Sequence, residues 1–422
     1  MIRNTMQIKN TIKNTLLWSQ KYTQTDMLYL AKGGSWLLMG QIIGSVANLL
    51  LIMAFANWLS KETFGTYKYV LSLLGILSIP SLSGLNSAVL NSASKNEDGT
   101  FLKAFQLKLK WGFWGTVASL VVALYYFLQS NPTLAVCFLI VACFLPFFNS
   151  LSLYESFLAG KKNFALQNKF SSLTQVVSLL FLGGTIFFTK NIFIILLAYF
   201  LPLTLLYALF FYLTKKKYRP EGKPNPKTIS FGKHLSIISI MGGVSNQLDK
   251  IILWHFLGPA PLAIYSISMI LPDRIKDILK IIGSLAMPKL VTKPIDELKK
   301  SIPKKTIQLF VLATPVMILY ILTAPFIFKW FFPQYVDSVI YSRIYALILL
   351  SFPRLLAGSV IQAKQKTKEL YIVSLVLTPV YWILLLALIP FFGLWGAIIS
   401  FLILEIATFI LQYWQFKKIT NS

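Results

Sequence analysis

Two arginines inside one long apolar stretch have the spacing to bind a phosphate group. Arg343 and Arg354 are eleven residues apart within residues 339–362. In a helix they return to within about 20° of the same face, roughly 16 Å apart along the axis. A guanidinium group binds phosphate oxygens through paired hydrogen bonds and stays charged when it loses water. The spacing predicts a phosphate-binding stripe; the alternative is that each side chain extends to the nearer membrane surface.

A second apolar stretch, residues 262–287, carries more charge than membrane-spanning helices usually tolerate. Its polar residues recur at helical spacing and form one stripe: Ser266, Asp273, Lys276, Asp277, Lys280 and Ser284. Arg274 lies about 100° around the helix from Asp273. We predict that this helix lines an aqueous cavity, with Arg274 and Lys280 among its substrate-binding cations. The alternatives are a helix lying at the membrane surface and charges that neutralise each other one turn apart.

Two acidic residues within apolar stretches are candidates for coupling a conformational change to a proton or a sodium ion. Asp249 follows the polar cluster formed by residues 245–247, and Glu405 lies near the middle of residues 394–416. A charge at the bilayer centre costs about 2.5 to 3.5 kcal/mol on insertion scales, so each carboxylate needs a reason to be there. The alternatives are that Asp249 pairs with an arginine and that Glu405 makes a helix-packing hydrogen bond.

The chain is too apolar for a water-soluble protein, so long helices must position these residues. Of its 422 residues, 56% are hydrophobic and only 13% are charged, against roughly a quarter charged in soluble domains. Runs of about 20 apolar residues predict twelve membrane-spanning helices. They cover residues 36–59, 67–90, 111–128, 133–153, 170–188, 191–213, 235–257, 262–287, 306–328, 339–362, 370–391 and 394–416.

The positive charge follows the sides of the membrane. The net charge is +26, and the basic residues of the predicted loops fall on every second loop, except for Lys61, Lys190 and Lys329. By the positive-inside rule, both termini are predicted to be cytoplasmic. Because the basic residues are spread over short loops and form no basic domain, we expect no nucleic-acid partner. The two cysteines and two histidines lack metal-ligand or disulfide spacing, so we expect no metal or other cofactor.

The chain divides into two halves of six predicted spans. We predict a basic cytoplasmic arm (1–32), a first six-helix lobe (33–213), a cytoplasmic linker rich in proline and glycine (214–234), a second six-helix lobe (235–416) and a short tail (417–422). Aligning the halves places Asn48 on Asn246. Two halves of the same orientation fit a parallel repeat with pseudo-two-fold symmetry, with a substrate site between the lobes. We therefore predict that Asn48 and Asn246 face that site.

Short motifs spread over residues 30–416 resemble those of the polysaccharide-type flippases, also called O-antigen flippases, of the multidrug/oligosaccharidyl-lipid/polysaccharide (MOP) exporter superfamily. They are LSKETFGTYKY at 59–69, DKIILWHFLG at 249–258, AMPKL at 286–290, FFPQYVDS at 331–338 and FGLWGA at 392–397. The resemblance implies an all-α, two-lobed, MATE-like protein of the bacterial cytoplasmic (inner) membrane. It further implies movement of an undecaprenyl-diphosphate-linked oligosaccharide by alternating access, for O-antigen or capsule biosynthesis, beside a polysaccharide polymerase and glycosyltransferases as partners.

Other functions remain as alternatives. A lipid II flippase or a drug exporter of the same superfamily would share this architecture. The first predicted span contains no charge, however, whereas cation-coupled drug exporters typically carry an acidic residue there. A membrane polysaccharide polymerase or ligase is an alternative of another class. It would need an outer catalytic loop, and the longest outer loop, residues 329–337, offers no pair of carboxylates. We therefore expect a protein without enzymatic activity.

The predicted topology can be tested by thiol labelling. A single cysteine introduced at Asn131 is expected to react with a membrane-impermeant reagent from outside the cell. A cysteine at Lys223 is expected to react only once the cytoplasmic side is opened. The reverse pattern, or reaction of both from one side, would contradict the topology.

Overall fold

Helices form every regular element in the described part of the chain. The computed structural model describes residues 27–292, 294–363 and 367–421. The elements of the first half are α2 (Met27–Trp58), α3 (Lys61–Leu77), η1 (Ile79–Ser81), α4 (Leu85–Ser94), α5 (Gly99–Leu128), α6 (Pro132–Leu151), α7 (Leu153–Gly160), α8 (Phe164–Phe188) and α9 (Ile192–Tyr218). Those of the second half are α10 (Pro226–Leu257), α11 (Pro259–Thr292), α12 (Ile295–Phe331), η2 (Pro333–Tyr335), α13 (Ser338–Tyr345), η3 (Ala346–Ser351), α14 (Arg354–Ala363), α15 (Thr367–Phe392) and α16 (Leu394–Asn421).

The predicted class, an all-α polytopic membrane protein, is confirmed. Each of the twelve predicted spans coincides with a helix or with consecutive helices. Among the described residues, seven helices are long and apolar enough to cross a membrane, or up to nine if each of two bent pairs is one span. The described apolar part of α2, Ile43–Trp58, is shorter. Helices α10 and α11 cover the two other predicted spans, and they carry many of the polar residues predicted to serve binding or coupling.

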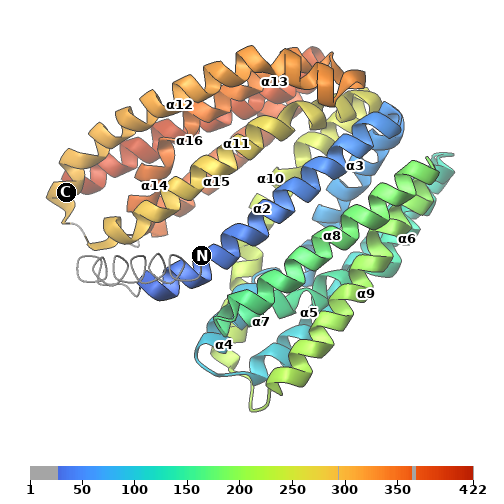
Figure 1. Cartoon of the computed structure of the whole chain (residues 1–422), viewed down its shortest axis with the longest axis horizontal. Coiled ribbons are helices and arrows are strands. Elements are labelled where there is room, and N and C mark those ends of the chain that lie inside the picture. Colours follow the sequence, from blue (N-terminus) through green and yellow to red (C-terminus); the bar gives the residue numbers. More distant parts are fainter. Residues whose placement is uncertain (1–26, 293, 364–366, 422) are drawn as a thin grey trace, which may run out of the picture.

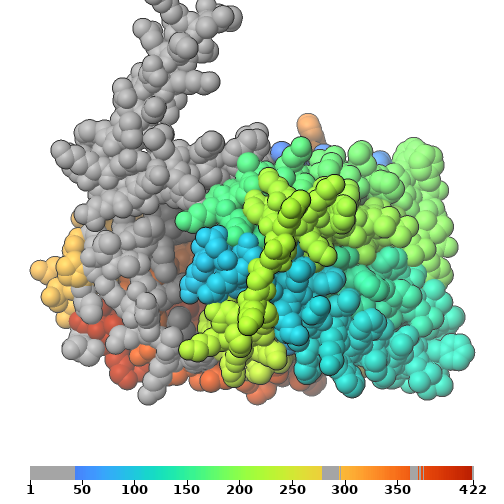
Figure 2. Space-filling view, turned by 90° about the horizontal axis from the view of Figure 1, so that it is seen from below, coloured from blue at the N-terminus to red at the C-terminus, as the bar shows by residue number. Residues whose placement is uncertain are grey.

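Local signals set several helix ends. Asn131 and Asn225 precede Pro132 and Pro226, and each asparagine side chain accepts a hydrogen bond from the first turn of the following helix. Asparagine at the N-cap followed by proline is a strong helix start. The predicted linker, 214–234, is shorter in the structure, because only residues 219–225 lie between α9 and α10. This segment crosses the start of α5 (yellow-green over cyan in Figure 2), where Asn225 bonds to Glu97 and Thr100.

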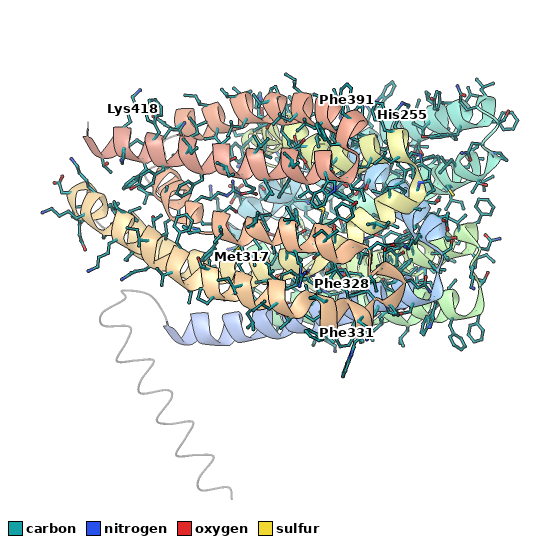
Figure 3. All side chains as sticks on the ribbon, turned by 90° about the horizontal axis from the view of Figure 1, so that it is seen from above. His255, Met317, Phe328, Phe331, Phe391 and Lys418 are labelled. Carbon is teal, nitrogen blue, oxygen red and sulfur yellow. The ribbon has the colours of Figure 1, made fainter. Side chains whose placement is uncertain are left out.

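The helices form two groups that correspond to the two halves of the chain. In Figure 1 the yellow, orange and red helices diverge from the green and cyan ones toward the end that carries the C-terminus. In Figure 3, Lys418 lies at one end of the molecule, whereas His255 and Phe391 lie toward the other. Corresponding pairs of helices pack alike: α2 along α8 and α10 along α15, then α8 with α9 and α15 with α16. This correspondence is what a parallel repeat predicts.

Two predicted spans are broken by proline-containing bends. Span two consists of α3 and α4 with a 43° bend at η1, which contains Pro80. Span ten is bent by 43° just before Arg354, next to Pro353. Proline lacks a backbone donor and clashes with the preceding turn, so it interrupts a helix.

The apolar core is continuous at one end of the molecule and divided at the other. The largest cluster joins both lobes through residues such as Phe55 and Tyr67 of the first and Tyr265 and Phe328 of the second. At the opposite end, one cluster around Phe157 belongs to the first lobe and its contact with α10. A separate cluster around Leu298 belongs to the second lobe alone. Apart from this contact of α10 with the first lobe, the lobes are therefore joined at one end and separate at the other.

The joined end is the one predicted to be outer. There the Asn57 amide donates to the carbonyl of Phe331, Gln334 donates to the carbonyl of Asn57, and Lys61 lies 3.2 Å from Asp337. The α3 backbone also touches the start of α11 directly. A methyl group placed on Gly65 would lie 1.9 Å from the carbonyl oxygen of Pro259, so only glycine permits this approach.

Helix α10 contacts both lobes. Near its start, the Ser236 hydroxyl accepts a hydrogen bond from the Gly84 amide at 2.9 Å, and Gly232 packs against α4. Further along, α10 packs against α11 and α15, and the Trp382 indole donates to Ser245 at 2.8 Å. Thus α10 closes the space between the lobes along one side.

Candidate functional site

A cavity of about 640 Å³ lies between the lobes. Its wall in the first lobe comes from α2, α8 and α9, and in the second lobe from Arg274 and Asp277 of α11. Asn48 lines the same cavity from α2, together with Ser45 and Gln175. Two of the predicted site residues, Asn48 and Arg274, are therefore brought together, and each comes from a different lobe.

Three cations from different helices lie near one another, and one of them, Arg274, lines this cavity. The ammonium group of Lys68 in α3 is repelled by both Lys250 of α10 and Arg274 of α11. Lys68 is half-buried, and its ammonium group also lies over the ring of Phe64. Repulsion among half-buried cations is unfavourable unless an anion occupies the site. We call Lys68, Lys250 and Arg274 the cationic cluster.

Sequence reasoning missed Lys68. It lies one residue inside the predicted start of span two, where a lysine is expected to reach the nearer membrane surface. The available signal was that no other charged residue occurs within that span. Lys250 directly follows Asp249 in the sequence and was not predicted as a site residue.

The carboxylates near the cationic cluster are held mainly by the second lobe. Tyr265 donates a 2.8 Å hydrogen bond to Asp249, whose other oxygen lies 3.8 Å from Lys250. Tyr345 donates a 3.0 Å hydrogen bond to Asp273. Asp249 is only 4% exposed, so the tyrosine compensates part of the cost of burying its charge. The predicted polar stripe of α11 therefore faces partly into the lobe and not only into the cavity.

Glu405 lies within an ion-pair network in the second lobe. Lys276 approaches it at 3.0 Å, and Arg354 contacts both carboxylate oxygens at 3.2 and 3.1 Å. The paired contact is the geometry that arginine makes with a carboxylate. Arg354 thus has a carboxylate of its own chain as partner, and its contact with a substrate phosphate stays a prediction.

Arg343 has a different partner from Arg354, because it supplies a hydrogen bond that a neighbouring helix lacks. Its Nε atom donates at 2.9 Å to the carbonyl of Ile321 in α12. In a regular helix that carbonyl accepts from the residue four positions later, which here is Pro325 and has no N–H. In an apolar membrane an unpaired carbonyl costs several kcal/mol. The partner of Arg343 therefore indicates a structural role.

The remaining predicted residues are not part of the first cavity. Asn246 lines a second cavity, together with residues of α3 and α10 that do not line the first. The side chain of Lys280 lies outside the described residues. Within the described part of the chain, no group of three His, Cys, Asp or Glu side chains is suited to hold a metal ion. The roles of Asn246, Asp249 and Glu405 in binding or coupling stay predictions.

The fold is shared with solved transporters of the MOP superfamily. An outward-facing MATE family multidrug resistance transporter matches with a TM-score of 0.65 at 14% identity, over 92% of this chain and 96% of its own. The lipid II flippase MurJ, in an inward closed conformation, matches with a TM-score of 0.67 at 13% identity, over 90% and 87%. At these identities the likeness establishes the fold class.

The particular family follows from the sequence comparisons. Residues 30–271 match the family model described as "Polysaccharide biosynthesis protein". A protein of Shigella flexneri named "Putative O-antigen transporter" is 22% identical over 93% of this chain and 99% of its own length. The chain belongs to the polysaccharide biosynthesis protein family, and the resemblance inferred from the short motifs is confirmed.

The role assigned to Arg343 can be tested by a double-mutant cycle. Arg343→Ala is expected to destabilise the purified protein by about 1–3 kcal/mol, because the carbonyl of Ile321 loses its donor. In a Pro325→Ala background the helix supplies its own N–H, so the same substitution is expected to cost clearly less. Unfolding in detergent measures both. Equal costs in the two backgrounds would show that the carbonyl is not the reason for Arg343.

Proposed function

We propose that this protein is a flippase that moves an undecaprenyl-diphosphate-linked oligosaccharide repeat unit across the cytoplasmic membrane. The product serves surface polysaccharide biosynthesis, as O-antigen or capsule. Membership of the polysaccharide biosynthesis protein family and the name of the Shigella flexneri relative support this assignment. A polysaccharide polymerase and glycosyltransferases are then its functional partners. Membrane lipids contact the outer faces of its helices.

The cationic cluster carries the proposal. Lys68 and Arg274 approach each other from opposite lobes, and Lys250 completes the group. A diphosphate would add negative charge beside Lys68 and Arg274, whereas Lys250 already has Asp249 at 3.8 Å, and the Arg274 guanidinium offers paired hydrogen bonds to the diphosphate oxygens. Because the ligand bridges cations of both lobes, its arrival changes the interaction free energy between them, which alternating access requires.

The arrangement of the lobes supports alternating access. Contacts such as Lys61 with Asp337 close the predicted outer end, while separate apolar clusters lie at the other end. This fits a state that receives substrate from the cytoplasmic side. Movement of the lobes about the joined end would then transfer the diphosphate to the other leaflet.

The alternatives receive less support. Drug exporters of this fold that take cationic compounds need acidic side chains, and the cations here oppose such a substrate. A lipid II flippase also takes a lipid-linked diphosphate, so family membership and not the cluster favours the polysaccharide substrate. A polymerase needs catalytic carboxylates in an outer loop, and the described outer turns supply only single acidic residues, such as Asp337.

A deletion strain tests this function. Without the gene, undecaprenyl-linked repeat units are expected to accumulate on the inner leaflet and surface polysaccharide to disappear, whereas loss of a polymerase would strand the units outside. Complementation with Lys68→Gln, Lys250→Gln or Arg274→Gln should lower export by roughly tenfold or more, since each removes a charged hydrogen-bond donor. Lys103→Gln, an exposed lysine of α5, is the matched control. Normal export by all three variants at normal abundance would refute the assignment of the cluster.

Coupling is proposed to involve Asp249, through a proton or a sodium ion. Its carboxylate accepts from Tyr265 and lies near Lys250 of the cationic cluster, so neutralising it changes the charge beside the diphosphate. Asp249→Asn is expected to fold, because it removes a buried charge, and to fail in complementation. Export assays together with protein abundance measure this. Full export by Asp249→Asn would leave Asp249 as a structural partner of Tyr265 and exclude titration.

A further inference from the structure

A second cavity, of about 990 Å³, has its lining on α3, η1, α4, α5, α6, α10 and α15. Among the described residues, none lines both cavities. Helices α3 and α10 pack closely, because Tyr69 and Trp254 stack with ring centroids 4.4 Å apart and Gly75 packs against Gln247. The second cavity therefore has a lining distinct from that of the cavity that holds Asn48 and Arg274.

One wall of this cavity is polar and contains a buried cation. Lys108 of α5 is only 2% exposed, and its ammonium group donates a 2.7 Å hydrogen bond to the Asn86 side chain. Further polar side chains come from Ser81 of η1, Ser83 between η1 and α4, Asn149 of α6 and Ser152 at the junction of α6 and α7. In the described part of the chain, no acidic residue lines the cavity. Burying an ammonium group costs free energy, and a neutral amide partner does not neutralise its charge. An anion bound beside the ammonium group would therefore stabilise it.

The other wall is largely apolar and exposed. Ile237 and Ile238 of α10 and Leu375 of α15 line the cavity, and they are 63%, 48% and 57% exposed. Exposed apolar side chains on a membrane protein are suited to lipid chains. The cavity is thus amphipathic, with a polar wall in the first lobe and an apolar wall in the second.

We propose that this cavity binds an anionic phospholipid of the bilayer, with a phosphodiester headgroup that carries hydroxyl groups, such as phosphatidylglycerol. The phosphate pairs with Lys108, the headgroup hydroxyls bond to the serine and asparagine side chains, and the acyl chains follow α10 and α15. An ethanolamine headgroup fits poorly, because its ammonium group finds no carboxylate among the lining residues.

Charge matching separates this site from the diphosphate site. Lys108 offers a single positive charge, which suits the single negative charge of a phosphodiester. The cationic cluster offers three cations, which suit a diphosphate. The same phosphate chemistry could come from the lipid-linked substrate, so the experiment compares both sources.

The test measures thermal unfolding of the purified full-length protein in detergent, with dioctanoyl phosphatidylglycerol or dioctanoyl phosphatidylethanolamine added. The expected result is a rise in Tm with the glycerol lipid only. Lys108→Gln should weaken that binding roughly tenfold or more, because a charged hydrogen bond is lost. Asn86→Asp should do the same while keeping a partner for Lys108, since it supplies a resident anion. Lys110→Gln, which removes an exposed charge from the same helix, should change nothing.

Undecaprenyl diphosphate without sugars is the second probe. Its binding is expected to depend on Arg274 and to be unaffected by Lys108→Gln. If Lys108→Gln weakens undecaprenyl diphosphate and phosphatidylglycerol does not bind, the cavity belongs to the substrate and the proposal is overturned. Equal binding of the two phospholipids, or wild-type binding by both Lys108→Gln and Asn86→Asp, would also overturn it.

Discussion

The cost of placing charge in an apolar bilayer determines how this protein arranges its polar side chains. In the second lobe, Asp249 accepts a hydrogen bond from Tyr265, Asp273 accepts one from Tyr345, and Glu405 pairs with Lys276 and Arg354. Lys68, in contrast, lies near two other cations, Lys250 and Arg274, and both repel it. Lys250 also lies 3.8 Å from Asp249, and Asp277 lines the cavity together with Arg274, so the group is not made of cations alone. Its positive charge still differs from the carboxylates held by hydrogen bonds within the second lobe, which is the basis for proposing an anionic ligand there.

Most of the fold could be predicted because the membrane imposes simple rules. Each of the twelve apolar runs lies on a helix or on consecutive helices, and Asn131 with Pro132 and Asn225 with Pro226 marked helix starts. The bends were less predictable. Pro80 and Pro353 break their spans, yet Pro146 lies within α6 without ending it. Whether a proline breaks a helix depends on whether neighbouring side chains satisfy the freed backbone groups, and a single sequence does not contain that information.

The site could be predicted only in part, for the same reason. Asn48 and Arg274 were chosen from different halves and meet in one cavity. Arg343 and Arg354 do share a helical spacing, but the bend before Arg354 breaks their common stripe, and each finds a partner in another helix. Glu405 and Ile321 lie far from these arginines in sequence, so only the tertiary structure reveals the pairings. Lys68 was not selected at all, although it is the one charged residue of the predicted span 67–90.

The double attachment of α10 has a mechanical consequence. Its start is fixed to α4 through Gly232 and Ser236, whereas its later turns are fixed to α11 and α15. A rigid helix that is attached to both lobes cannot move with both of them when the lobes rotate relative to each other. Either the contact with α4 breaks, or α10 flexes between its attachments, where Gly242 and Gly243 adjoin and nothing lies within 4 Å of the Cβ position of Gly242. The bending stiffness of that short stretch of backbone then limits how far the two lobes can turn.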